Sequence, residues 1–231
     1  MKALAIAELT DSAGGRSRGE ILALTDASVL TGGKPLFLPE ESHRYVLCPS
    51  LGILTCNTGR KIAPRFVHRY CQSLTVAALL WDLDELDRCR TLGLPYTRAC
   101  SFDFSLPRGK TIPFSVEAME RFSFTFRAGD REQTWSVAAQ APDWRERLGA
   151  MSRLFTFRTG DLLLPALGPG LPVAVDTHVS AWCADTDNLE PHHILDFNIK
   201  SKRYDSYYSL CLPGWPAWPT PPPSPSPATL R

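Results

Sequence analysis

The chain has 231 residues, of which 44% are hydrophobic, and its 25 basic and 24 acidic side chains nearly balance. This length suits one domain with a large buried core and leaves little room for two. The balanced charge gives no general electrostatic reason to bind nucleic acid or an anionic membrane, and no apolar stretch is long enough to span a bilayer. We therefore expect neither nucleic acid nor a membrane among its partners.

The N-terminal segment and the cysteines favour a cytoplasmic protein. The opening MKALAIAEL is interrupted by Glu8 too soon for a secretory signal, and a first strand explains it better. The seven cysteines are odd in number and contain no C-x-x-C pair, which favours reduced thiols. A zinc site built from distant cysteines is the alternative, and the missing paired ligand spacing argues against it.

The first half of the chain predicts mainly strands. Two apolar runs, ALAIAEL and EILAL, predict a hairpin across a loop rich in Gly, Ser and Arg, and LFLP (36–39) predicts an extended segment. Residues 45–55 predict a strand that Pro49 and Gly52 weaken. Pro64 suits the first turn of a helix, and SLTVAALLW (73–81) has the length of a buried strand. DLDELDRCRTLG predicts a short helix ending at Gly93.

The second half continues the strand-rich pattern. Phenylalanine alternates with Ser and Thr at 122–126, which predicts a hairpin with a turn at 128–130. PDWRERLGAMSRLF (142–155) predicts a helix with one apolar side. The later runs LLLPAL, PVAVDTHV and HILDFNIK predict strands. This order predicts a mixed α+β, β-rich fold with two or three short helices and excludes a doubly wound parallel sheet.

The composition changes near residue 200, which divides a domain of residues 1–200 from a tail of residues 201–231. Proline dominates from Leu212 onward and excludes helix and sheet pairing, so we expect an extended, disordered tail. Its prolines could instead dock an SH3-like or WW-like partner module. Trp215 and Trp218 are large enough to dock on an apolar groove.

The sequence contains none of the general catalytic motifs G-x-S-x-G, G-x-x-x-x-G-K-[ST] and H-E-x-x-H. GPGLP (168–172) lacks the lysine and the helix of a phosphate loop and is predicted to be a turn. The neighbouring His192 and His193 would point to opposite faces of a strand and so would not chelate one metal. The acidic cluster at 82–87 favours a helix start over a metal site.

MSRLFTFRTGDLLLPALGPGL (151–171) is similar to the signature near the end of the fumarylacetoacetate hydrolase family domain. The matching residues are Ser152, Arg153, Phe155, Thr156, Gly160 and Asp161. Further segments, in colinear order over about residues 1–200, resemble the same family in its compact bacterial branch. RAGDREQTWS (127–136) resembles a family hairpin, with Asp130 at its acidic turn. GRKIAPRFVHRY, SLTVAALLWDLD, RACSFDFSLPRGK, LPEESHRYV and DFNIK also resemble family segments.

The resemblance implies a mixed sheet folded round a central cleft, and it is the motive for expecting a homodimer. It also implies divalent-metal chemistry on C–C bonds of oxo-acids, whether hydrolysis, decarboxylation or keto–enol isomerisation. Three carboxylates would hold Mg²⁺ or Mn²⁺ there, because these ions prefer hard oxygen ligands. The ion would polarise the substrate oxygens and stabilise an enolate.

The three carboxylates that the resemblance implies are missing from this sequence. The Glu-x-Glu positions, counted back from Gly59, fall at Cys48 and Ser50, and the aspartate of the next strand falls at Leu79. No Asp or Glu occurs between residues 45 and 81, so a one-residue register error restores nothing. A thiol prefers softer metals, and a hydroxyl is a weak ligand for a hard cation. A family lysine falls at Cys100, and the Thr-Gly-Thr-Pro turn falls at 164–167.

Few positions at the implied active site keep suitable side chains. Asp103 and Gln133 match family identities. The nearest match to the family's lid His and Glu is His43 with Glu40 or Glu41. The candidate catalytic residues are therefore His43, Glu41, Asp103 and Gln133.

Three hypotheses follow. In the first, the chain is a pseudoenzyme that keeps the family fold as a scaffold or binding domain and needs no cofactor. In the second it is an enzyme, either of the family type, with Mg²⁺ or Mn²⁺ and a small oxo-acid, or with relocated chemistry. A relocated site could combine His43 with Asp82, Asp84 and Asp103, or use Cys48 as a nucleophile, although a buried inert thiol is the simpler account of Cys48. In the third, it is an interaction protein whose tail recruits a partner.

Overall fold

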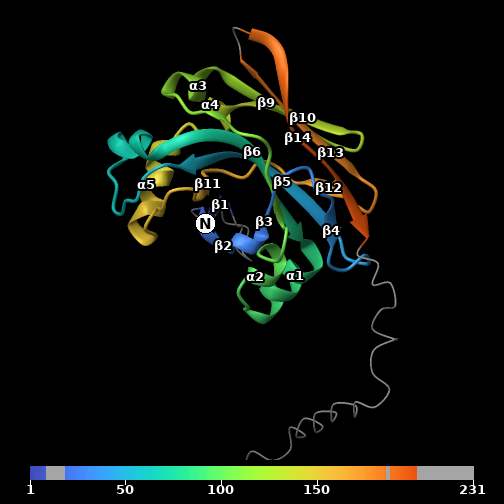
Figure 1. Ribbon diagram of the computed structural model, residues 1–231. Helices are drawn as coiled ribbons and strands as arrows, with labels where there is room; N and C mark the ends of the chain where they lie inside the picture. The colour runs from blue at the N-terminus through green and yellow to red at the C-terminus, as the bar shows by residue number, and fades with distance from the viewer. Residues whose placement is uncertain (9–18, 186–187, 202–231) are drawn as a thin grey trace, which may run out of the picture.

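The computed structural model describes residues 1–8, 19–185 and 188–201 (Figure 1). Of the predicted tail (201–231), residues 202–231 lie outside these residues, and so do residues 9–18 of the predicted loop between the first two strands. None of the helices in the described part of the chain is both long and apolar enough to cross a membrane.

The larger sheet runs in the strand order β2-β1-β11-β5-β6-β8, and β12 also pairs with β5. Only the β1–β11 pair is parallel, so the sheet is mixed. The strands are β1 (Ala3–Ala7), β2 (Glu20–Leu24), β5 (Tyr45–Thr55), β6 (Cys71–Asp82), β8 (Ile112–Pro113), β11 (Leu162–Leu164) and β12 (Leu171–Val173).

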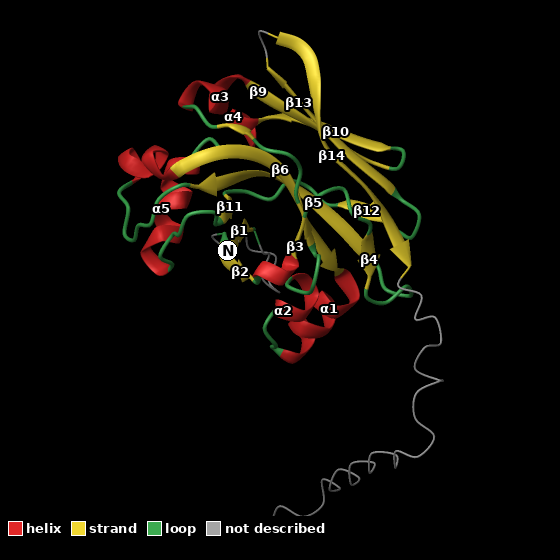
Figure 2. Cartoon of the chain, viewed as in Figure 1, coloured by secondary structure: helices red, strands yellow, loops and turns green. Residues whose placement is uncertain are grey.

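A second sheet has the order β10-β9-β13-β14-β4, and two further strands, β3 and β7, pair with each other. These strands are β3 (Val29–Leu30), β4 (Leu36–Leu38), β7 (Leu106–Pro107), β9 (Phe122–Ala128), β10 (Arg131–Ser136), β13 (His178–Asp185) and β14 (Asn188–Ser201). Figure 2 shows the second sheet lying against one side of β5 and β6. Apolar residues of both sheets share one core cluster, with Leu51 and Val76 from the first and Phe124 and Phe126 from the second.

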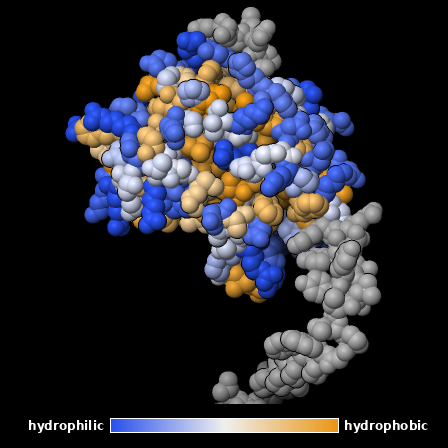
Figure 3. All heavy atoms as spheres, viewed as in Figure 1, coloured by the Kyte–Doolittle hydropathy of each residue, from blue (hydrophilic) through white to orange (hydrophobic). Residues whose placement is uncertain are grey.

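The helices lie around the edges of the sheets (Figure 2). They are α1 (Leu83–Leu92), α2 (Thr97–Cys100), α3 (Val116–Arg121), α4 (Val137–Gln140), α5 (Trp144–Leu154) and two 3-10 helices, η1 (Asp26–Ser28) and η2 (Pro64–Tyr70). In the described part only α1 and α5 reach ten residues. Figure 3 shows an apolar patch near the tip formed by α1 and α2, where Leu92 and Leu94 are exposed.

The predicted strand-rich α+β fold is confirmed. The hairpins β1–β2 and β9–β10 pair antiparallel as expected. Helix α1 begins after Asp82, whose carboxylate accepts from the Glu85 amide at 2.9 Å, and it ends at Gly93 with a φ of 63°. The acidic cluster at 82–87 is therefore a helix start, as predicted. The helix predicted from Pro64 is 3-10 rather than α.

Strand β5 tolerates the proline that weakened its prediction. Pro49 lies opposite Ala78 of β6. Its carbonyl oxygen accepts from the Gly168 amide, so the backbone polar groups of Pro49 point away from β6. β5 pairs on this side with β11 through Ile53 and Leu54 and with β12 through 45–47, which leaves 48–52 without a strand neighbour there. The missing N–H of Pro49 therefore removes no ladder hydrogen bond.

Candidate functional site

The residues at the implied metal positions come together on one face of the larger sheet. Cys48 of β5 lies directly opposite Leu79 of β6, and Ser50 lies opposite Ala77. Because strand side chains alternate, Cys48 and Ser50 share a face. Cys100, at the implied lysine position, belongs to the same group of packed residues as Leu79. The fold thus brings the implied positions together, and the side chains found there are mostly apolar.

We call this group the second core cluster. Its buried members are Ala3, Ala5, Ala7, Leu24, Ala77, Leu79, Trp81, Leu86, Ala99, Cys100, Leu106, Leu162 and Leu164. Cys48 and Leu167 are partly buried against it. Leu79 and Leu164 are completely buried. An apolar core therefore occupies the region where the resemblance implied a metal-binding cleft.

The polar atoms that remain at these positions do not form a ligand set for Mg²⁺ or Mn²⁺. The Ser50 hydroxyl lies 2.7 Å from the Ala166 carbonyl oxygen and 2.8 Å from that of Leu51, to which it can donate. Burial raises the pKa of the Cys48 thiol to about 12, so the thiolate is disfavoured at neutral pH. In the described ranges, no group of three His, Cys, Asp or Glu could hold a metal ion. The residues present do not fit a hard divalent cation.

Cys48 also lacks the activation that a nucleophile requires. Arg44, its nearest cationic neighbour in sequence, donates to the Asp84 carboxylate at 2.7 and 3.0 Å and to Asp87 at 3.0 Å. Because this guanidinium is paired with two carboxylates and the thiol pKa is raised, the structure favours the inert thiol.

A side-chain amide lies beside the stretch of β5 that has no strand neighbour between β11 and β12. Gln140 of α4 accepts from the Leu51 amide at 3.0 Å and donates to the Pro49 carbonyl oxygen at 3.2 Å. Gly168 donates to the same oxygen at 2.7 Å, and a Cβ at Gly168 would lie only 2.9 Å from it. The GPGLP stretch leads into β12 rather than into a helix, so it is not a phosphate loop.

Among the candidate catalytic residues, His43 has a defined partner. Its Nδ1 lies 2.7 Å from the carboxylate of Asp82, which is almost completely buried. This hydrogen bond raises the pKa of His43. Asp84 of the possible relocated site is paired with Arg44 instead, and Asp103 lines a hollow whose lining includes neither His43 nor Asp82. Of that site, the structure joins His43 and Asp82 by a hydrogen bond, with Asp84 near enough to act on His43 electrostatically, and it leaves Asp103 elsewhere.

The other candidates lie in different places. Glu41 is exposed and accepts a hydrogen bond from the Ser201 hydroxyl. Gln133 lies on β10 beside a hollow of about 380 Å³ that Trp135 and Gln140 also line. Within the described ranges, neither forms a hydrogen bond or ion pair with the His43 side chain. The backbone amide of His43 donates to the Glu40 carbonyl oxygen at 3.3 Å. The lid pair of His43 with Glu40 or Glu41 stays a prediction.

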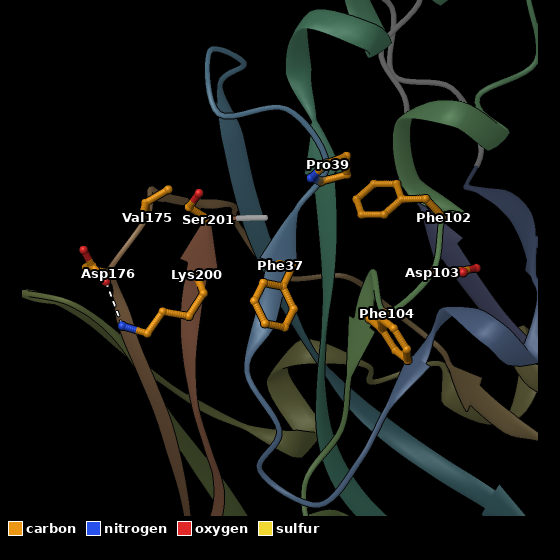
Figure 4. A pocket seen from close by; sticks show the side chains of 9 residues that line it. All are labelled: Phe37, Pro39, Phe102, Asp103, Phe104, Val175, Asp176, Lys200 and Ser201. Atoms are coloured by element: carbon orange, nitrogen blue, oxygen red, sulfur yellow. Dashed lines mark hydrogen bonds and ion pairs between the residues drawn. The ribbon is translucent and has the colours of Figure 1, made fainter. Parts of the chain in front are cut away.

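A hollow of about 970 Å³ was not predicted from the sequence; we call it the aromatic hollow. It is lined by Phe37, Pro39, Phe102, Asp103, Phe104, Val175, Asp176, Lys200 and Ser201. Figure 4 shows Phe102 and Phe104 facing the side of Phe37 and Pro39, while the Asp103 carboxylate is turned away from Phe37. An ion pair of 2.8 Å joins Lys200 to Asp176 on the other side of β4. The clustering of Phe in LFLP and SFDFS is the one sequence signal for this hollow.

The signature residues that survive have structural partners. Buried Asp161 accepts from the backbone amides of Lys2 and Arg158 at 3.0 and 2.7 Å, and it pairs with the Lys2 ammonium. Gly160 has a φ of 83°, where a side chain would be strained. The Ser152 hydroxyl accepts from the Ile62 amide at 2.9 Å. These residues join chain segments far apart in sequence, which gives them a role in folding.

Comparison of the backbone with solved structures identifies the fold. An Escherichia coli protein assigned provisionally as an isomerase superposes with a TM-score of 0.72 at 17% identity, over 86% of this chain and 91% of that one. A yeast fumarylacetoacetate hydrolase family protein superposes with a TM-score of 0.70 at 12% identity, over 87% and 92% of the two chains. The chain has the fumarylacetoacetate hydrolase fold.

A third structure with this fold contains a metal. The fumarylpyruvate hydrolase of Pseudomonas aeruginosa, in complex with Mn²⁺ and pyruvate, superposes with a TM-score of 0.66 at 18% identity, over 87% of this chain and 89% of that one. Neither a family model nor a curated protein sequence matches the chain. The predicted resemblance is thus confirmed in the fold.

Proposed function

We propose that this fumarylacetoacetate hydrolase-fold protein is non-catalytic and acts as a scaffold or binding domain. The observation that carries the proposal is the second core cluster. Leu79 is completely buried where the resemblance implied an aspartate, and Cys48 packs against the same cluster where it implied a glutamate. Where the resemblance implied side chains that hold a cation, this chain has apolar side chains that exclude water.

A metal-binding site and an apolar cluster need different surroundings. A metal-binding carboxylate needs either its cation or water, because an unpaired buried charge is strongly disfavoured. An apolar cluster needs neither and stabilises the fold by burial. The Ser50 hydroxyl already has backbone acceptors, and the neutral Cys48 thiol suits apolar surroundings. The same atoms cannot meet the demands of both sites.

The direct test is turnover of fumarylpyruvate with Mn²⁺ present, since the fumarylpyruvate hydrolase of Pseudomonas aeruginosa binds that ion and is the positive control. We expect no hydrolysis above the metal-only blank. Hydrolysis that requires Mn²⁺ and falls in Ser50→Ala would overturn the proposal. Ser152→Ala is the matched control, because that serine is also buried but belongs to another part of the fold.

A second candidate function, acid–base chemistry by His43, is favoured by its 2.7 Å contact with Asp82. A buried carboxylate orients the imidazole through Nδ1 and raises the pKa of His43, which leaves Nε2 as the nitrogen that can exchange a proton with a substrate. Metal-free isomerisation or decarboxylation of a small oxo-acid, lost in His43→Gln and kept in His178→Gln, would favour this function over the first.

We further propose that the protein is a cytoplasmic homodimer. All six cysteines in the described ranges are free thiols, which suits a reducing compartment. Multi-angle light scattering tests the dimer, and a monomer mass at every accessible concentration would reject it.

A further inference from the structure

The aromatic hollow is a concave surface separate from the second core cluster. It shares no residue with the second core cluster, and two of its rings are open to solvent, with exposed fractions of 42% for Phe37 and 46% for Phe104. Several apolar side chains gathered in a concave surface usually mark a contact site. Phe104, which lines the hollow, also has a φ of 65°, a backbone conformation that is unfavourable for an aromatic residue.

The position of the hollow indicates what covers it. Ser201, the last described residue, is part of its lining, so residues 202–231 begin at its rim. A segment tethered there has an effective concentration on the order of millimolar, which compensates for weak contacts. Ten residues separate Ser201 from Leu212. Fully extended, that connection spans about 33–36 Å, which is enough to leave the rim and return.

The sequence of the tail matches an aromatic hollow. Residues 212–221 read LPGWPAWPTP. A polyproline II helix has about three residues per turn and rises about 3.1 Å per residue. Trp215, Trp218 and Pro221 would therefore lie along one side of such a helix, about 9 Å apart. Grooves lined by aromatic rings bind proline-rich segments in this conformation, which loses little entropy on binding.

We propose that residues 212–221 dock in the aromatic hollow of their own chain, with Trp215 and Trp218 packed against Phe37, Phe102 and Phe104. The docked segment covers the exposed rings with apolar surface of its own. An indole N–H can donate to polar atoms at the rim, where Asp103 and Ser201 lie. The tail is thereby a built-in ligand, and a proline-rich partner would compete with it for the hollow.

The test uses the full chain labelled with 5-fluorotryptophan, whose six tryptophan ¹⁹F resonances are assigned by single Trp→Phe substitutions. We expect Trp215 and Trp218 to differ in chemical shift from a synthetic peptide of residues 210–223. Phe104→Ala and Phe37→Ala should move both resonances towards the peptide values. Phe66→Ala is the matched control, because Phe66 is 38% exposed and lies on η2, outside the hollow.

Three outcomes would overturn the proposal. Tail resonances identical to those of the peptide in the unsubstituted chain would show that the tail does not dock. Chemical shifts of Trp215 and Trp218 that stay the same in Phe104→Ala and Phe37→Ala would show that the tail binds elsewhere. Shifts that vanish on dilution would make a second copy the occupant. The resonances of buried Trp81 and Trp144 report in each sample whether the variant has folded.

Discussion

Leu79→Asp restores the carboxylate that the family resemblance implies at this position, and we expect it to destabilise the protein severely. Leu79 is completely buried in the second core cluster. Truncating such a leucine to alanine costs about 2–5 kcal/mol. An unpaired buried polar group adds about 1–3 kcal/mol. Leu79→Asp should therefore lower the free energy of unfolding by about 4 kcal/mol or more. At about 2–4 °C per kcal/mol, the midpoint should fall by about 8–16 °C.

The assay is thermal melting of the wild type, Leu79→Asp and Leu92→Asp, each with and without millimolar Mn²⁺. Leu92 is 59% exposed, so its substitution controls for the added charge and should cost less than about 1 kcal/mol. An ion that binds only the native state raises its stability by mass action. The reasoning fails if Leu79→Asp melts within about 3 °C of the wild type. It fails equally if Mn²⁺ restores the midpoint of Leu79→Asp and leaves that of Leu92→Asp unchanged.

Three further predictions follow from particular contacts. Gln140→Ala should lower the free energy of unfolding by about 1–3 kcal/mol, because the Leu51 amide loses its acceptor and the Pro49 carbonyl oxygen keeps only the Gly168 amide as a donor. Equal costs for Gln140→Ala and Gln133→Ala would contradict this. The pKa of His43 is raised in the folded protein, so its pairing with Asp82 should stabilise fully below the unfolded pKa of about 6.5 and be lost as pH rises through the folded pKa. Since the His43 side chain is 33% exposed, the wild type should exceed His43→Gln by less than about 1 kcal/mol at acidic pH and by nothing at alkaline pH, and a gap independent of pH would contradict this. Cys48, with its raised pKa, should react with iodoacetamide at neutral pH only after unfolding, and equal labelling of native and denatured protein would contradict this.

The elements that the sequence predicted are those whose patterns are local. The β9–β10 hairpin is marked by alternating phenylalanines, and α1 is marked by Asp82 at its start and Gly93 at its end. Pro49 weakened the prediction of a strand at residues 45–55. The rule against proline in strands assumes that the strand is hydrogen-bonded to a neighbouring strand on both sides. Here β11 and β12 pair with different parts of β5 and leave Pro49 between them without a strand neighbour on that side. This arrangement depends on tertiary structure and cannot be read from the sequence of β5.

The site was also predictable only in part, because part of it depends on contacts between segments far apart in sequence. Counting along the resembling segments placed Cys48 and Leu79 at equivalent family positions, and the structure pairs them directly. The apolar filling by Ala3, Ala5 and Leu164 was not predicted, because those residues come from strands far away in sequence. The aromatic hollow likewise joins residues 37–39, 102–104, 175–176 and 200–201, which only the folded chain brings together.

Titration of the full chain with Mn²⁺ by isothermal calorimetry, with oxalate present as an oxo-acid mimic, tests the central claim most directly. Buried Leu79, the Ser50 hydroxyl hydrogen-bonded to the backbone, and the raised pKa of the Cys48 thiol together predict no saturable heat in the micromolar range. Micromolar binding that Ser50→Ala and Cys48→Ala each abolish, and that Ser152→Ala leaves intact, would contradict the account.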